Sequence, residues 1–166
     1  MSNVTGGNVR VGFGYDIHRL EVGRPLWLGG VLIADADRGA VAHSDGDVLL
    51  HALCDALLGS VGLEDIGAHF PDTDPAYKGI ASLTLLTRVV RLLDERGATP
   101  VNVDCTVVLE RPKIGPYRTE MRAAIAKGLG VSTDAVSIKA TTNEALGPIG
   151  AGDGIAAYAV ASVVIL

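Results

Sequence analysis

Asp16 and His18 lie two residues apart, just after an alternating apolar stretch at residues 9–15. In an extended chain such residues point to the same side, so the carboxylate and the imidazole converge, and Ile17 is expected to point to the core. A carboxylate and an imidazole on one side supply half of a zinc or other transition-metal site. The triplet alone is a weak signal, because helix N-caps and exposed strand ends also carry this spacing.

A second group of polar residues lies on a helix expected at residues 43–58, with Ser44 as its N-cap. Ser44, Asp47, His51 and Asp55 follow at intervals of three, four and four positions, which places them on one helical face. A solvated face is the simpler interpretation, but this stripe lacks the Lys, Arg and Glu residues usual there. The stripe is therefore a candidate for function.

His51 is the natural third ligand beside Asp16 and His18. Three Asp and His donors describe an open zinc site with one position left for substrate. Asp47 or Asp55, each one helical turn away, could accept the other N–H of His51 and fix its tautomer.

Residues around this helix could contact a phosphorylated ligand. His43 precedes a Ser-Asp-Gly helix start, where N–H groups favour anions, although an exposed loop histidine is the alternative. In the loop that follows the helix, carboxylates at glycine turns suit ribose hydroxyls or a hydrated cation, and turn capping is the simpler explanation. The candidates in this loop are Asp65, Gly67, Phe70, Asp72 and Asp74.

A strand expected at residues 136–140 leads into Thr141, Thr142 and Glu144. Hydroxyl donors followed by a carboxylate suit a phosphate that carries Mg²⁺. The glycine-rich segment 147–154 matches neither the P-loop nor the dinucleotide-binding pattern, since no strand-to-helix context surrounds it.

The elements that must position these residues predict an α+β domain. A mixed four-stranded sheet with helices packed on one face is expected, and its uncovered face favours a partner subunit. The strands are expected at 9–15, 101–109, 136–140 and 155–166, a hairpin at 26–33, and the helices at 43–58, 82–95 and 117–127.

Composition narrows the class of protein. The 166 residues fit a single catalytic domain, 9–166, behind a frayed polar lead at 1–8. With 14 Lys and Arg against 19 Asp and Glu, the net charge of −5 argues against nucleic acid or an anionic membrane as partner. The most apolar stretch is too short to span a bilayer, and the N-terminus lacks a signal-peptide core.

Cys54 and Cys105 cannot form a zinc-cysteine cluster or a disulfide framework. Buried free thiols in a reducing, cytoplasmic compartment are expected. Cys54 is also a possible fourth metal ligand, although its apolar neighbours favour a core position.

Five motif blocks carry a resemblance to a known family. They read D-I-H at 16–18, A-H-S-D-G-D-V-x-x-H-A-L-x-D-A-L-L-G at 42–59, D-I-G-x-x-F-P-D-T-D-P at 65–75, V-D-C-T-V-V-L-E-R-P-K at 103–113, and I-K-A-T-T-N-E-x-L-G at 138–147. Together they resemble the 2-C-methyl-D-erythritol 2,4-cyclodiphosphate synthase family of non-mevalonate isoprenoid biosynthesis. The resemblance runs from about residue 9 to the C-terminus.

The resemblance implies a phosphorus-oxygen lyase that is a homotrimer with active sites between subunits. Its substrate would be 4-diphosphocytidyl-2-C-methyl-D-erythritol 2-phosphate, converted to the cyclic 2,4-diphosphate with release of CMP. Zn²⁺ would be held by Asp16, His18 and His51, and Mg²⁺ or Mn²⁺ by Glu144. His43 and Thr142 would be catalytic, stabilising the transition state. The substrate-binding residues would be Ser44, Asp65, Gly67, Phe70, Asp72, Asp74, Lys113, Ala140, Thr141 and Thr142.

Two positions depart from the family pattern. Pro148 and Ala151 stand where the family often carries an aromatic residue and an arginine, facing a central trimer cavity that can hold an isoprenoid diphosphate. Their presence weakens the expectation of that accessory binding. Asn143 replaces a frequent threonine, a change expected to be mild.

Two other functions compete with a cyclase. A zinc-dependent phosphohydrolase would use the same open metal site with water as the nucleophile, and Asp47 or Asp55 as the candidate base. A zinc-stabilised trimeric binding protein would unfold when the metal is removed.

Overall fold

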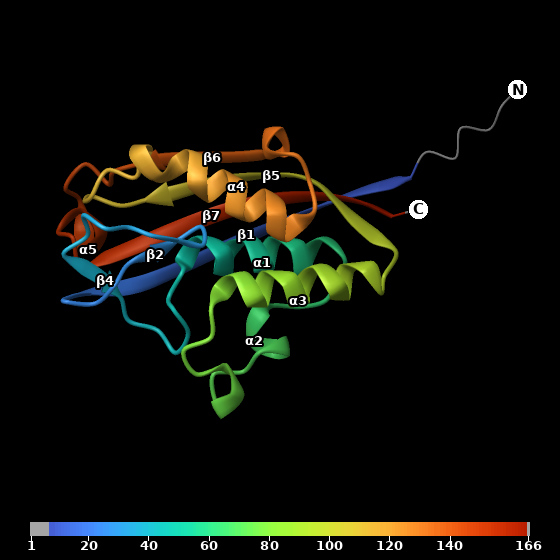
Figure 1. The fold of residues 1–166 in the computed structure, drawn as a ribbon, viewed down its shortest axis with the longest axis horizontal. Coiled ribbons are helices and arrows are strands. Elements are labelled where there is room, and N and C mark those ends of the chain that lie inside the picture. Colours follow the sequence, from blue (N-terminus) through green and yellow to red (C-terminus); the bar gives the residue numbers. More distant parts are fainter. Residues whose placement is uncertain (1–6, 166) are drawn as a thin grey trace, which may run out of the picture.

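The computed structural model describes residues 7–165 and contains one mixed five-stranded sheet (Figure 1). The strand order is β4-β1-β7-β5-β6, in which β5 and β6 run parallel and the other neighbours are antiparallel. A separate hairpin joins β2 to β3. The strands are β1 (Asn8–Val22), β2 (Trp27–Leu28), β3 (Val31–Leu32), β4 (Arg38–Ala40), β5 (Ala98–Val108), β6 (Val136–Thr141) and β7 (Gly154–Ile165).

The expectation of four strands was wrong by one. Strand β1 continues to Val22, seven residues beyond its expected end, and its last three residues pair with β4 at the sheet edge. Strand β4 is only Arg-Gly-Ala, with no apolar alternation for a sequence pattern to detect.

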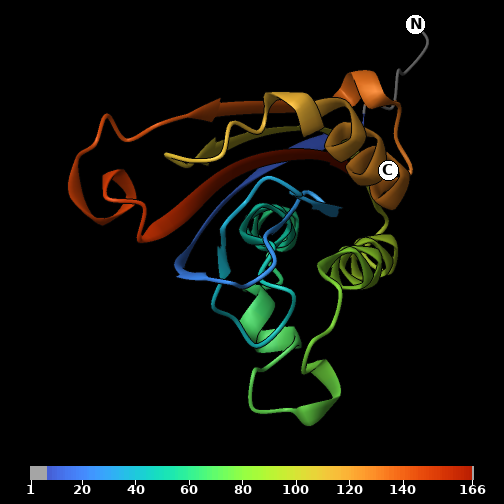
Figure 2. The same ribbon diagram turned by 60° about the vertical axis from the view of Figure 1, so that its left-hand side comes forward.

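Three longer helices pack with the sheet. Helices α1 and α3 lie on the same side of β1 and β7, and α4 packs against α3 and β6 (Figure 2). The helices are α1 (Val48–Ser60), α2 (Ile66–His69), α3 (Ser82–Asp94), α4 (Arg118–Leu129) and α5 (Gly147–Gly150), with 3₁₀ turns at Pro75–Tyr77, Gly115–Tyr117 and Thr133–Ala135.

Helix α1 starts later than expected, because its N-cap is Asp47 and not Ser44. The side chain of Asp47 accepts the Leu50 N–H at 3.0 Å, as an N-cap should. Residues 43–47 therefore form a loop, which frees His43 and Ser44 to face a ligand.

Two glycines let α1 lie unusually close to β1. A Cβ atom added at Gly12 or Gly14 would come within 1.9 Å of the carbonyl oxygens of Ala56 or Ala52. Only glycine permits this approach of the strand to the helix backbone. The next residues of β1 on the same side are Asp16 and His18, so the approach brings them to α1.

The opposite side of β1 and β7 is apolar and exposed in the single chain. Val9, Val11, Phe13, Tyr15 and Ile17 alternate along β1 on this side, and Phe13 is 63% exposed. Tyr158 of β7 lies beside Tyr15, with the two rings tilted and their centroids 5.0 Å apart. A contiguous apolar face of this kind is typical of a protein interface.

The expected frayed lead lies mostly at residues 1–6, outside the described residues, while Asn8 already begins β1. Among residues 7–165, the helices are too short or too polar to cross a bilayer.

Candidate metal centre

Asp16 and His18 project from β1 toward α1, in the same direction as Gly12 and Gly14. Ile17 points the other way and is 49% exposed, so the expectation that it faces the core was wrong. The expectation failed because the glycine side of β1 faces the core and the apolar side faces outward.

His51 on α1 completes a compact group of donors with Asp16 and His18. His51 Nδ1 lies 3.0 Å from Asp16 Oδ2 and 3.1 Å from His18 Nε2, and that His18 atom lies 3.2 Å from the same carboxylate oxygen. Ligand atoms bound at 2.0–2.2 Å in a tetrahedron lie about 3.3–3.6 Å apart, so the three donors fit a metal ion after a small outward movement. These three residues could hold a metal ion.

The electrostatics of the group also suit a cation. Burial lowers the pKa of His18 despite the neighbouring Asp16 charge, which keeps its imidazole neutral and able to ligate at neutral pH. Burial acts in the same direction on the pKa of His51. The hydrogen bond and the charge of Asp16 outweigh the effect of burial and raise the pKa of His51. The charges of Asp47 and Asp45 act in the same direction as Asp16. The surroundings of His51 therefore favour positive charge, whether a proton or a metal ion supplies it.

The other ring nitrogen of His51 does not meet Asp47 or Asp55, contrary to expectation. Asp47 accepts the N–H groups of Gly29 and Gly30 at 3.0 and 2.7 Å, and Asp55 accepts that of Ile66 at 2.8 Å. Both carboxylates hold loops against α1.

Cys54 is fully buried, and burial raises the pKa of its thiol. It lies outside the group that could hold a metal.

A cavity of about 190 Å³ opens beside the donors. It brings His43, Ser44 and Phe70 together with His18 and His51, as expected for one site. Ile66, at the start of α2, also lines it.

The acidic residues of the loop after α1 make local hydrogen bonds. Asp65 caps α2 by accepting the Ala68 N–H at 2.9 Å, and Asp74 caps a 3₁₀ turn by accepting the Ala76 N–H at 2.9 Å. Turn capping, the simpler of the two explanations, therefore accounts for Oδ1 of each carboxylate. Gly67 lies within α2, and Asp72 is exposed in the turn before Asp74.

A second cavity, of about 390 Å³, lies at the ends of β5 and β6. It is lined by Lys113, Ala140, Thr141 and Thr142, four of the expected substrate residues, and shares no lining residue with the cavity beside the metal donors. Thr142 Oγ1 donates to Glu144 Oε1 at 3.0 Å at its margin. The expected site residues thus form two groups within one chain.

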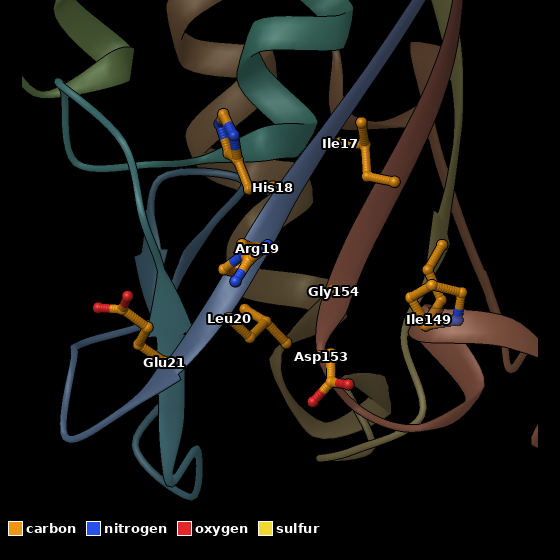
Figure 3. A pocket seen from close by; sticks show the side chains of 9 residues that line it. Ile17, His18, Arg19, Leu20, Glu21, Ile149, Asp153 and Gly154 are labelled. Carbon is orange, nitrogen blue, oxygen red and sulfur yellow. The ribbon is translucent and has the colours of Figure 1, made fainter.

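A third cavity, of about 540 Å³, lies between β1 and the segment that begins with α5. Both His18 and Ile17 line this cavity, and Figure 3 shows them projecting from opposite sides of β1. Pro148 and Asp153 line its other wall, and Arg38 Nη1 lies 3.2 Å from Asp153 Oδ1.

The sequence model of the YgbB family matches residues 9–164. The chain belongs to the YgbB family. This match and the synthases described next together confirm the resemblance stated from the motifs.

Several known proteins are similar to this chain over most of its length. A 2-C-methyl-D-erythritol 2,4-cyclodiphosphate synthase of Symbiobacterium thermophilum is 63% identical over 92% of this chain and 97% of its own length. A solved structure of such a synthase in a CDP-bound form has a TM-score of 0.86 at 42% identity and covers 93% of this chain and 99% of that chain. The bifunctional IspDF of Campylobacter jejuni has a TM-score of 0.92 at 38% identity, over 96% of this chain and 43% of that chain.

Two residues of this YgbB-family chain lie beside the candidate metal centre without having been expected there, Ser82 in contact with His51 and Asp45 behind Ser82. Ser82, the first residue of α3, places its Oγ 3.0 Å from His51 Nε2, and Asp45 binds Ser82 in turn. Sequence spacing could not reveal them, because Ser82 lies 31 positions from His51 and 37 from Asp45.

Proposed function

We propose that this chain is a 2-C-methyl-D-erythritol 2,4-cyclodiphosphate synthase. The observation that carries the proposal is the 63% identity to a synthase of that name over nearly the full length of both chains. The substrate would be 4-diphosphocytidyl-2-C-methyl-D-erythritol 2-phosphate. An oxygen of the 2-phosphate forms a bond to the β-phosphorus, the bond from the β-phosphorus to the bridging oxygen breaks, and CMP leaves with that oxygen.

We assign Zn²⁺ to Asp16, His18 and His51, and Mg²⁺ or Mn²⁺ to Glu144. The convergence of one carboxylate and two imidazole nitrogens at 3.0–3.2 Å supports the first assignment. The Glu144 carboxylate, hydrogen-bonded to Thr142 at the margin of the cavity that would hold the diphosphate, supports the second, since hard oxygen donors suit Mg²⁺. When bound, the two ions would neutralise charge on the diphosphate and so favour attack at the β-phosphorus.

The residues of the chain would act by positioning both ends of one molecule. Phosphoryl transfer within a molecule depends mainly on orientation and charge stabilisation, and no covalent nucleophile is needed. His43 and Ser44 would hold the 2-phosphate beside the metal donors, and Thr142 would stabilise the charge that develops on the transferred phosphoryl group.

The remaining site residues would contact different parts of the substrate. Phe70, Asp72 and Asp74 would line the erythritol side, and Asp65 and Gly67 would bind the ribose. Lys113, Ala140 and Thr141, in the cavity beside β5 and β6, would hold the cytidyl diphosphate. Because that cavity is separate from the metal centre in one chain, the complete site needs the second cavity from another subunit.

A homotrimer would supply that subunit. The exposed apolar side of β1 and β7, including Phe13, Tyr15 and Tyr158, is the surface available for such an assembly. The active sites would then lie between neighbouring subunits.

The test is phosphorus NMR of the purified protein with the cytidyl diphosphate substrate, Zn²⁺ and Mg²⁺. Wild type should release CMP and a cyclic diphosphate, and His51→Ala should release neither. His69→Ala serves as the matched control for metal content, because His69 contacts the Leu63 carbonyl and not the metal donors. CMP with a linear product would show a phosphohydrolase, and folded, zinc-loaded protein without turnover would show a binding protein; either result overturns the proposal.

A further inference from the structure

The two ring nitrogens of His51 face different partners. Nδ1 faces the metal donors Asp16 and His18, whereas Nε2 faces two hydroxyls, Ser44 Oγ at 3.1 Å and Ser82 Oγ at 3.0 Å. A neutral imidazole carries one N–H and one lone pair, so the position of its proton decides which side can bind a metal. The metal centre needs the lone pair on Nδ1.

The hydroxyl of Ser82 has a fixed direction. Its Oγ donates to Asp45 Oδ1 at 2.5 Å, and its backbone N–H donates to Asp45 Oδ2 at 2.8 Å. A carboxylate only accepts, so both protons of Ser82 are committed to Asp45. The lone pairs of Ser82 Oγ are left to accept a proton from His51 Nε2.

We propose that Asp45 and Ser82 form a positioning pair that accepts the Nε2–H of His51 and thereby holds its Nδ1 toward the metal. The inference rests on the metal-binding role proposed for His51. Neither Asp45 nor Ser82 contacts an atom that would ligate the metal, so both act through His51.

Ser44 does not have the same directing effect. Its Oγ accepts the Gly46 N–H at 3.1 Å, and its own proton is not committed to a carboxylate among the described residues. Ser44 can therefore either accept from Nε2 or donate to it. Ser82 can only accept, because Asp45 holds its proton.

The fold builds the pair from two loops. The Asp45 N–H donates to the Ile80 carbonyl at 3.1 Å, and the Gly79 N–H donates to the His43 carbonyl at 2.8 Å. Helix α3 has no side-chain cap from its own N-cap residue, and Asp45 accepts its first N–H, that of Ser82, instead. Ser82 is fully buried, which shields its hydrogen bonds from water.

The first test is the ligating nitrogen of His51 in zinc-loaded protein, measured by long-range ¹H–¹⁵N correlation NMR on histidine-labelled protein. Wild type should show the metal on Nδ1 and a proton on Nε2 that exchanges slowly with water, because Ser82 Oγ accepts it. In Ser82→Ala this acceptor is lost, so the Nε2 proton should exchange faster. Ser44→Ala, the matched serine variant, should keep the slow exchange.

The second test is affinity for Zn²⁺, measured by competition with a chromophoric chelator. Loss of a residue that orients a metal ligand typically costs about 10- to 100-fold in affinity, and Ser82→Ala should fall in this range. Asp45→Asn should also weaken binding, because an amide cannot accept both protons of Ser82. It retains the shape of Asp45 if Ser82→Ala fails to fold.

The outcomes separate this inference from the proposed function. Metal on Nε2 of His51 in wild type, or equal loss of affinity in the two serine variants, would overturn the role of the Asp45–Ser82 pair while leaving the synthase assignment intact. If wild type binds no Zn²⁺, the metal assignment itself fails.

Discussion

Nδ1 of His51 lies 3.0 Å from Oδ2 of Asp16, although the two residues are 35 positions apart in the chain. Asp16 comes from the sheet and His51 from a buried helix, so the candidate metal centre joins β1 to α1. A ligand that binds there should therefore stabilise the packing of the two elements as well as serve the reaction.

Metal should stabilise the folded protein measurably. At a free Zn²⁺ concentration 100 times its Kd, about 2.7 kcal/mol of stabilisation is expected, which corresponds to a Tm increase of about 5–11 °C for a chain of this length. Calorimetry with Zn²⁺ and with a chelator measures the shift. His51→Ala should lose the shift and His69→Ala should keep it; a Zn²⁺-dependent increase in His51→Ala would place the ion elsewhere.

Glu144→Gln should affect the second ion alone. Loss of the carboxylate should raise the Mg²⁺ concentration needed for half-maximal activity by about 10-fold or more, because a neutral amide binds Mg²⁺ poorly. Zinc content, measured by atomic absorption, should stay unchanged. An unchanged Mg²⁺ requirement would remove Glu144 from the site.

Phe13→Asp should break the proposed trimer. Phe13 lies at the centre of the exposed apolar side of β1, where a buried charge without a partner is strongly unfavourable. Light scattering should show one third of the wild-type mass, with the circular dichroism spectrum retained. Thr87→Asp, on the exposed side of α3, is the control and should keep the wild-type mass. A monomeric wild type would contradict the assembly.

Asp47→Ala should destabilise the fold by about 3 kcal/mol or more. Asp47 is fully buried and accepts three backbone N–H groups, from Gly29, Gly30 and Leu50, each of which would lose its partner. Urea unfolding measures the loss. Asp74→Ala removes an N-cap from a more exposed turn and should cost about 1 kcal/mol. Equal losses in the two variants would mean that burial is irrelevant.

The Asp104–Lys139 ion pair should make a pH-dependent contribution to the free energy of unfolding. The hydrogen bond that Lys139 Nζ donates at 2.6 Å is the main reason that the pKa of Asp104 lies below its usual value. A depressed folded-state pKa stabilises the protein above the unfolded pKa of about 3.9, and the gain is lost as the pH falls through the folded value.

Because both side chains are about half exposed, the gain should be below about 1 kcal/mol. Lys139→Met should therefore lower Tm slightly at neutral pH, and this difference from wild type should shrink below about pH 4. Lys127→Met is the control. A difference that grows on acidification would contradict the assigned direction.

The sequence predicted that Asp16, His18 and His51 would come together because each lies in a regular element with a fixed period. Asp16 and His18 follow the two-residue repeat of a strand, and His51 follows the helical repeat. Their convergence then needed only that α1 pack on β1, which the apolar face of the helix favours.

What the sequence did not predict depends on contacts between distant segments. Ile17 was expected to face the core because apolar side chains usually do, but the core side of β1 is marked by Gly12 and Gly14. Asp45 and Ser82 were unremarkable in sequence, since each meets the other only after two loops fold together. Strand β4 is too short to carry any pattern.

Gly14 carries no reactive group, yet it sets the distance across which Asp16, His18 and His51 meet. A methyl group there would collide with the Ala52 carbonyl at 1.9 Å and force α1 away from β1. His51, one residue before Ala52, would move with the helix. In a saturation-mutagenesis screen for activity, Gly14 should therefore tolerate as few replacements as His51 itself, and an alanine there should yield a folded protein that no longer retains zinc.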